Sequence, residues 1–464
     1  MIGKPLVAAD ADISFSQCAG CAAPAICTVL AMIRDTAVII HSPAGCAASF
    51  ADFNRKYKGM LRRKGLPSRN APLISTNLTE MDMVFGAEPK LEEAIKEAIR
   101  RFAPKAVFIA ASCGSGISGL DIQDVIDRVQ GNFGVPITTV VCELYAPKKW
   151  GSGFGGKEHG LLTKVIKPPE AGLENPSFYN VIDFSEDDSI KKLLHETGIR
   201  WNYVAYGAEY ETLERMGGAL ATFHLHADRF GSYLAGKLQE DYQVPNVSLP
   251  LPAGFAGTEA CLRKIGEAVG RKSEFAALIT RERSRYTERL SKLKERLKGI
   301  RCLPIVEGLD YESGILSILR ELNVEIAGES GEKYCAARPA PVKGKQASRR
   351  PVHSSDSLYG PEGLRIGFYQ GYELLPLVRL VSPDVLVVKH RSLAAWGVRL
   401  GIPCLWLDED AAFYGYEGLL RFGERLADLA GNPHHARRMA AHTQLPYSEW
   451  WMELKLFWEV GRHG

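Results

Sequence analysis

The sequence lacks a long apolar segment. Its longest apolar runs, Ala106 to Ala111 and Val385 to Val388, are far shorter than the roughly 20 residues needed to cross a bilayer. The N-terminal stretch MIGKPLVAADADIS also lacks a basic region followed by an apolar one, which is the pattern of a secretion signal. We therefore expect a cytoplasmic protein with no membrane partner.

Excess charge of one sign is small, and cysteine is sparse. Lys and Arg number 57 and Asp and Glu number 54, so the formal net charge is +3. This excess does not supply the phosphate-binding surface of a sequence-independent nucleic-acid binder, and nucleic acid is not an expected partner.

Ten cysteines in a chain of 464 residues are too few for a disulfide scaffold. They are expected to be core residues, metal ligands or nucleophiles.

A repeated rhythm of short β-rich runs, turns with Gly or Ser, and charged helices is the main pattern that the sequence does contain. It predicts parallel α/β sheets. The early strand candidates, each followed by small residues, are Thr36 to His41, Ala106 to Ala111 and Pro136 to Cys142. A helix is predicted over Glu88 to Phe102, where apolar residues recur at helical spacing.

The same rhythm restarts twice along the chain. It begins again at YNVIDF near Tyr179, and once more after a long charged helix predicted from Lys272 to Lys298. A chain of this length exceeds the size at which one hydrophobic core keeps growing. The sequence therefore predicts an α/β protein with three Rossmann-like, doubly wound parallel-sheet domains, over residues 1–170, 171–295 and 296–464.

Most of the candidate chemistry lies in one N-terminal stretch, SFSQCAGCAAPAICTVLAMIRDTAVIIHSPAGCAASF. Its cysteines, with one that directly follows the predicted strand KAVFIAAS, are Cys18, Cys21, Cys27, Cys46 and Cys113. Thiolates at strand ends and helix N-termini are stabilised as anions by backbone N–H groups and the helix dipole. Cys46 and Cys113 fit that position, which suits metal ligation or nucleophilic chemistry.

The Cys18 and Cys21 pair also invites a zinc or thioredoxin-like interpretation. No second Cys-x-x-Cys or His pair lies at zinc-finger spacing, and the pair precedes any βαβ unit. Both interpretations are weaker than the one that joins these cysteines to the later ones.

Three further motifs are weak signals. Residues 151–156, GSGFGG, satisfy the letters of a dinucleotide-binding loop but do not follow a strand directly. His224 and His226 lie on one face of a predicted strand, where buried histidines near domain interfaces are commoner than metal ligands. The stretch from Ala337 to Gly360 is rich in Pro, Ser and basic residues and is predicted to be a surface loop.

Several segments, taken in order along the chain, resemble the nitrogenase component 1 superfamily. They are Cys21, the HSPAGC motif that ends at Cys46, STNLTEMDMVFGAEPKLEEAI, SCGSGISGLDIQDVI around Cys113, KGIRCLPIVEG, SPDVLVVKH, RLGIPCLWLDED and FYGYEGLL. The superfamily includes nitrogenase subunits, their cofactor-assembly scaffolds, light-independent protochlorophyllide reductase and methylthio-alkane reductase.

The resemblance implies that Cys21, Cys46 and Cys113 are metal ligands that hold half of an iron–sulfur cluster, with Cys18 as the alternative to Cys21. A homologous second subunit would hold the other half, in an α2β2-type heterotetramer. The cluster would be P-cluster-like, either 8Fe–7S or 4Fe–4S, and a larger iron–sulfur cofactor could be present in the complex. An ATP-dependent iron protein would supply electrons for a small-molecule substrate. Soft thiolate ligands suit iron–sulfur clusters.

The chain departs from the family at the positions that bind the active-site cofactor. Catalytic nitrogenase subunits use a Cys in the second domain and a His in the third, whereas this chain has HLHADRF and Asp408 there. Either the chain is the partner subunit that carries only the relay cluster, or His226 and Asp408 replace the usual cofactor ligands. We expect a nitrogenase-like reductase acting on small organic sulfur compounds such as methylthio-alkanes. The alternatives are a cofactor-assembly scaffold and a cluster-free α/β binding protein.

Overall fold

The computed structural model divides the chain into two compact units. We call residues 17–186 and 194–249 the N-terminal unit, and residues 1–16, 187–193 and 250–464 the C-terminal unit. The structure describes residues 27, 30–47, 50–112, 115, 121–141, 165–169, 177–182, 189–225, 229–306, 309–330, 359–360, 363–366, 378, 381–388, 391–407 and 413–445.

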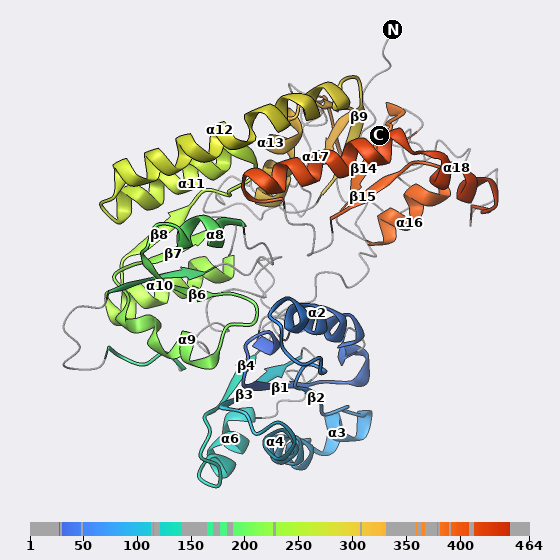
Figure 1. Ribbon diagram of the computed structural model, residues 1–464. Helices are drawn as coiled ribbons and strands as arrows, with labels where there is room; N and C mark the ends of the chain where they lie inside the picture. The colour runs from blue at the N-terminus through green and yellow to red at the C-terminus, as the bar shows by residue number, and fades with distance from the viewer. Residues whose placement is uncertain are drawn as a thin grey trace, which may run out of the picture. The chain divides into compact units, whose positions relative to one another are not determined.

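A four-stranded parallel sheet opens the N-terminal unit. Its strands, in the spatial order β2-β1-β3-β4, are β2 (Leu73–Ser75), β1 (Thr36–His41), β3 (Ala106–Ala111) and β4 (Ile137–Val141). The helices around it are η1 (Ala44–Ala47), α2 (Phe50–Arg63), α3 (Glu80–Phe85), α4 (Glu88–Phe102) and α6 (Ile122–Gln130). Figure 1 shows α2 on one side of this sheet and α4 with α6 on the other, as in a doubly wound fold.

Side chains along β1 and β3 point alternately to the two faces of the first sheet, so each face has its own hydrophobic core. Val38 and Ile40 belong to the core on the α2 face, whereas Ala37 and Ile39 belong to the core under α4 and α6. Both strands are buried along their whole length, as expected of central parallel strands. Helix α4 contributes its buried stripe of Leu91, Ala94, Ile95 and Ala98, at the spacing predicted from the sequence.

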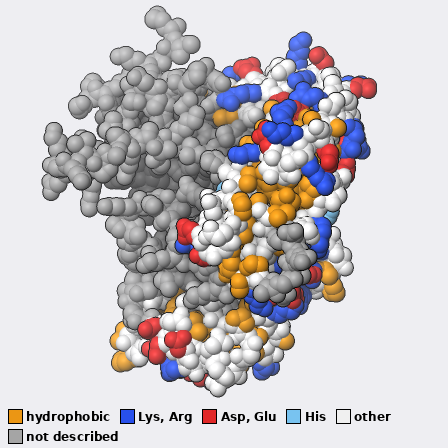
Figure 2. Space-filling view, turned by 90° about the vertical axis from the view of Figure 1, so that its left-hand side faces the viewer, with side chains coloured by type: hydrophobic (Ala, Val, Ile, Leu, Met, Phe, Trp, Pro, Cys, Tyr) orange, Lys and Arg blue, Asp and Glu red, His pale blue; other side chains and the backbone are white. Residues whose placement is uncertain are grey.

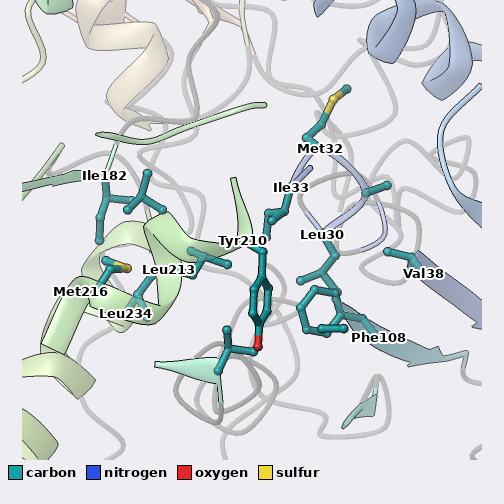
Figure 3. Close-up of a cluster of buried hydrophobic side chains, with 14 of the residues drawn as sticks. Leu30, Met32, Ile33, Val38, Phe108, Ile182, Tyr210, Leu213, Met216 and Leu234 are labelled. Atoms are coloured by element: carbon teal, nitrogen blue, oxygen red, sulfur yellow. The ribbon is translucent and has the colours of Figure 1, made fainter. Parts of the chain in front are cut away.

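A second parallel sheet completes the N-terminal unit. Its strands, in the order β6-β5-β7-β8, are β6 (Arg200–Val204), β5 (Phe178–Ile182), β7 (Thr222–Leu225) and β8 (Asn246–Leu249). The neighbouring helices are α8 (Ser189–His195), α9 (Tyr210–Glu214), η3 (Arg215–Gly218) and α10 (Arg229–Tyr242). One continuous core joins the two sheets of the unit: Figure 3 shows Leu30, Ile33 and Phe108 in the same cluster as Tyr210 and Leu213.

The C-terminal unit contains a third parallel sheet and a helical layer. The sheet, in the order β10-β9-β14-β15, is formed by β10 (Glu325–Ile326), β9 (Arg301–Ile305), β14 (Val385–Val388) and β15 (Cys404–Trp406). The helices are α11 (Gly254–Ala268), α12 (Lys272–Leu297), α13 (Leu309–Glu321), α16 (Arg391–Arg399), α17 (Gly415–Gly431) and α18 (His434–Ala441). Helices α11, α12 and α17 pack against one another.

The three four-stranded sheets share one strand order, in which the second strand in sequence lies beside the first and the third and fourth follow on its other side. This repetition confirms the predicted α/β class with Rossmann-like sheets. The predicted boundaries at residues 170 and 295 stay predictions.

A small three-stranded sheet departs from the purely parallel expectation. Its strands, in the order β11-β13-β12, are β11 (Gly328–Ser330), β13 (Gly363–Ile366) and β12 (Tyr359–Gly360), and β12 pairs antiparallel with β13. The last two residues of the predicted basic loop are therefore a strand. The rest of that loop, and the GSGFGG motif at residues 151–156, lie outside the described residues.

No helix in the described ranges has the length and apolar character that a bilayer crossing needs. On the face drawn in Figure 2, acidic and basic side chains are intermixed rather than separated by sign. This agrees with the small net charge of the chain.

Candidate metal centre

The strand order of the first sheet creates a switch point between β1 and β3. The chain passes from β1 to β2 on one side, whereas β3 and β4 lie on the other. In open α/β sheets, ligands bind outside the carboxyl ends of the strands at such a point. The last residues of the two strands, His41 and Ala111, are direct partners in the sheet.

Two of the predicted ligands follow these two strand ends. Cys46 lies in η1, directly after β1, where its side chain is partly buried against the α2-face core and its N–H donates to the Pro43 carbonyl at 3.2 Å. Cys113 is itself outside the described residues, but it follows Ser112, whose N–H donates to the His41 carbonyl at 3.1 Å. The structure therefore brings both connections to one edge of the sheet. Cys21 and its alternative Cys18 lie outside the described residues.

Hydrogen bonds hold the backbone at this edge. The Ser42 N–H donates to the Thr76 hydroxyl at 3.1 Å, and the Ser42 carbonyl accepts from Leu78 N–H at 2.9 Å. The two serines that flank Cys113 are bonded to each other, because the Ser115 hydroxyl donates to the Ser112 carbonyl at 2.8 Å. These bonds fix the backbone position at which the chain leaves β1 and β3.

His41 is a functional candidate that the sequence analysis did not single out. Its side chain is 0 % exposed, and neither ring nitrogen has a hydrogen-bond partner. Burial lowers the pKa of His41 to about 4, against an opposite but smaller effect of the Glu88 and Asp82 carboxylates. The imidazole is therefore neutral at pH 7. The signal in the sequence is a histidine that directly follows the apolar run AVII of the strand TAVIIH.

Helix α3 presents an exposed apolar face near the same edge, because it begins five residues after β2 ends. Met81, Val84 and Phe85 are 64 %, 74 % and 77 % exposed. Thr79 and Asp82 form a capping box that starts the helix. Hydrogen bonds from Lys90 and Thr79 lower the pKa of Asp82 to about 2.

The two residues predicted to bind a larger cofactor follow strands of the second and third sheets. His226 follows the end of β7 and Asp408 follows the end of β15, and both lie outside the described residues. His224 is buried on β7, where its Nδ1 lies 3.0 Å from the Leu225 carbonyl oxygen. This contact fits the structural role that the sequence favoured for His224.

The described cysteines of the C-terminal unit, Cys261 in helix α11, Cys302 in β9 and Cys404 in β15, differ from Cys46. Cys261 and Cys302 are completely buried, and burial raises the pKa of the Cys302 thiol well above its usual range. Burial also raises the pKa of Cys404 to about 12. The Cys302 and Cys404 thiols therefore stay protonated, and protonated thiols are poor metal ligands.

The residues at the first sheet fit a thiolate-held metal group. A partly buried thiol packed on the α2 face, a buried imidazole with two unsatisfied nitrogens and a hydrogen-bonded backbone edge follow or end the strands β1 and β3 at the switch point. In the part of the chain that the structure describes, no group of three or more His, Cys, Asp or Glu residues is arranged to hold a metal ion. Since two of the three predicted ligands lie outside that part, this result leaves the three-cysteine site a prediction.

Comparison with known proteins gives consistent matches over most of the chain. The family described as "Nitrogenase component 1 type Oxidoreductase" matches residues 21–430. The cofactor biosynthesis protein NifE of Nostoc sp. is 26 % identical over 425 residues, which cover 89 % of this chain and 83 % of NifE. The nitrogenase molybdenum-iron protein alpha chain of Methanosarcina barkeri is 26 % identical over 311 residues, covering 64 % and 57 % of the two chains.

A solved structure shares the fold. The structure titled "Nitrogenase Cp1 at pH 5" superposes with a TM-score of 0.70 at 20 % identity, covering 92 % of this chain and 90 % of the other.

Proposed function

Because the chain belongs to the nitrogenase component 1 type oxidoreductase family, we propose that it is one subunit of a multi-electron reductase with an iron–sulfur relay site at the switch point of its first sheet. The observation that carries this proposal is the position of Cys46 and of the connection to Cys113 after the two paired strands β1 and β3. Cys21, Cys46 and Cys113 would be the ligands, with Cys18 as the alternative to Cys21. A homologous second subunit would complete the cluster, as 8Fe–7S or 4Fe–4S, in an α2β2-type assembly.

The chain's own residues would hold and shield this group. Thiolates at Cys46 and Cys113 would bind iron at the end of a buried sheet, where the apolar core beneath excludes water. The hydrogen-bonded edge from Ser42 to Leu78 would keep the ligand-bearing connections rigid. When bound, the cluster would supply one-electron transfer.

The exposed face of α3 supports a docking site for an ATP-dependent iron protein. Three large apolar side chains on one short helix cost solvation unless a partner covers them, and exposed apolar clusters of this kind mark interaction sites. The helix follows β2 and so lies near the carboxyl edge of the first sheet, where the relay site is proposed. Electrons from a protein docked on α3 would have a short path to that edge.

We propose that the substrates are methylthio-alkanes or related small molecules and that the reaction is reductive cleavage of their C–S bond. Two electrons and two protons would convert one C–S bond into a C–H and an S–H bond, with the iron protein as reductant. His226 and Asp408 would be the residues of this chain to test for binding of a larger cofactor, each at its own sheet end.

A cofactor-assembly scaffold is the second candidate. The observation that favours it is the name of several relatives, which are described as iron-molybdenum cofactor biosynthesis proteins. The absence of Cys from HLHADRF also suits a scaffold, which must release what it binds.

A turnover assay separates the two functions. The anaerobically co-purified complex would receive iron protein, ATP, reductant and a methylthio-alkane, and the released thiol and hydrocarbon would be measured by gas chromatography. A reductase forms both products in equal amounts. A scaffold forms neither product and transfers iron and sulfide to an added acceptor protein.

A further inference from the structure

Basic residues are concentrated in helix α2 and in the loop that follows it. Between Phe53 and Thr79 the chain has seven Lys and Arg residues and no Asp or Glu. The rest of the chain holds 50 basic and 54 acidic residues, so the small net charge of the whole chain conceals a strong local excess. The seven basic residues are Arg55, Lys56, Lys58, Arg62, Arg63, Lys64 and Arg69.

Three of these residues, Lys58, Arg62 and Arg69, are exposed without a carboxylate partner. In the part of the chain that the structure describes, no Asp or Glu forms an ion pair with any of them, whereas the other four basic residues of the segment have interactions of their own. The exposed face of α4 differs, because its basic residues pair with carboxylates, as Lys96 does with Glu92 at 2.6 Å. We call Lys58, Arg62 and Arg69 the α2 basic patch.

Helix stability does not account for the two patch residues that lie on α2. Tyr57, Met60 and Leu61 turn one side of the helix into the core, and this leaves Lys58 and Arg62 exposed one turn apart. Like charges at this spacing destabilise a helix. The helix dipole favours Arg62, which lies in the last turn, but it does not favour Lys58 in the middle of the helix.

The loop after α2 brings Arg69 to the same side of the helix. Gly65, at φ +67, ends the helix in the left-handed conformation. The Ala71 N–H then donates to Asn54 Oδ1 at 2.8 Å. Asn54 lies one turn before Lys58 on the same row of the helix. The loop therefore returns along this row, and Arg69 lies two residues before its attachment point.

The surroundings of the α2 basic patch favour a carboxylate-rich polypeptide as its partner. The large apolar side chains that are exposed in the described residues lie on α3, on α18 and at Leu220, so the patch has no apolar anchor for a bilayer. The patch lies toward the carbonyl end of α2, where the helix dipole disfavours a small anion held against the helix. Three charges are too few for stable, sequence-independent binding of nucleic acid. Carboxylates of another protein reach the tips of these long side chains without approaching the helix end.

We propose that Lys58, Arg62 and Arg69 form a docking site for an acidic segment of a partner protein. The site shares no residue with the apolar face of α3, which we assign to the iron protein, and it does not depend on the iron–sulfur site. Complementary charges at such a site accelerate association and make it sensitive to salt.

The test measures binding of fluorescein-labelled poly-L-glutamate to the full chain by fluorescence anisotropy, at low and at physiological salt. Lys58→Glu combined with Arg62→Glu should weaken binding by at least about tenfold and reduce its dependence on salt. Lys58→Gln combined with Arg62→Gln removes the charges without reversing them, and its affinity should lie between those of the unmodified chain and the Glu variant.

Arg437→Glu combined with Arg438→Glu is the matched control. Both residues are exposed on α18, and neither forms an ion pair in the described ranges, so the change in net charge is the same as in the first double variant. The control should bind poly-L-glutamate as the unmodified chain does. Equal weakening in the two double variants would show that overall charge determines binding, and would overturn the proposal.

Three further results would contradict an acidic polypeptide as the partner. Displacement of the peptide by inorganic phosphate at constant ionic strength would identify a small-anion site. Tighter binding of single-stranded oligo-dT, or of phosphatidylglycerol vesicles, would identify a nucleic-acid or a membrane surface. The iron content of the anaerobic complex tests the relay site separately, and neither double variant should change it.

Discussion

Cys46 differs from the buried cysteines of the C-terminal unit because it follows the carboxyl end of a strand. We expect Cys46→Ala and Cys113→Ala to lose most of the bound iron, because each removes a thiolate ligand. Cys261→Ala and Cys302→Ala should keep it, since both thiols are completely buried within the C-terminal unit and the predicted ligands all belong to the N-terminal unit. Iron analysis of the anaerobic proteins checks this. Equal loss in all four variants would indicate general destabilisation and remove the ligand assignment.

His41 also gives the iron-free chain a predictable pH dependence. Its pKa falls from the usual 6.5 to about 4 on folding, so the unfolded chain binds more protons between these values. The free energy of unfolding should therefore decrease as the pH falls from 6.5 to 4, by roughly 3 kcal/mol for this group. His41→Leu should lack this part of the slope in urea unfolding measured across that range. Identical slopes in the two proteins would contradict the lowered pKa.

Helix α11 begins at a glycine that its surroundings require. Gly254 has φ +69, and an added Cβ would collide with the Glu321 carboxylate, which accepts a hydrogen bond from Phe255 N–H at 2.9 Å. Gly254→Ala should destabilise the chain by more than about 1 kcal/mol in urea unfolding, because the left-handed conformation alone costs that much.

Gly236 in α10 is the control for this prediction. It has no neighbouring heavy atom within 4 Å of an added Cβ. Gly236→Ala should therefore stabilise by about 0.5–1 kcal/mol through helix propensity. A loss of stability at Gly236, or none at Gly254, would be inconsistent with this account of the helix start.

Helix α3 is the element that we expect an iron protein to contact. Phe85→Ser should raise the iron-protein concentration for half-maximal turnover by roughly tenfold, because an aromatic anchor at an interface contributes more than about 1 kcal/mol. The rate at saturation and the iron content should stay the same. Met439→Ser on α18, 44 % exposed, is the control. A half-saturation concentration unaffected by Phe85→Ser would exclude α3 from the docking surface.

Much of the whole fold could be predicted from local pattern. Strands β1 and β3 and helix α4 have the predicted bounds, because continuous apolar runs and a helical apolar stripe are strong local signals. Strand β6, RWNYV, was not predicted, because only two of its five side chains are buried and its apolar pattern is weak. The antiparallel pairing of β12 with the nearby β13 was not predicted either, because β12 has only two residues and ends a stretch whose Pro, Ser and basic residues are typical of a surface loop.

The candidate site was predictable only in part. The strand-end position of Cys46 follows from its place after an apolar run. The isolation of the His41 ring does not, because whether a buried nitrogen finds a partner depends on three-dimensional packing. The exposure of Phe85 could not be predicted for a similar reason, since the apolar residues of EMDMVF have the same spacing as those of a buried helix.

The whole-molecule claim is that this chain and a homologous subunit share a cysteine-held iron–sulfur cluster. The most direct test is anaerobic co-purification of the complex, with quantification of iron and acid-labile sulfide and EPR of the reduced protein. We predict that a second, homologous subunit co-purifies, that iron and sulfide are present together, and that the EPR signal disappears in Cys46→Ala. Absence of both iron and acid-labile sulfide from the unmodified anaerobic complex would contradict the account.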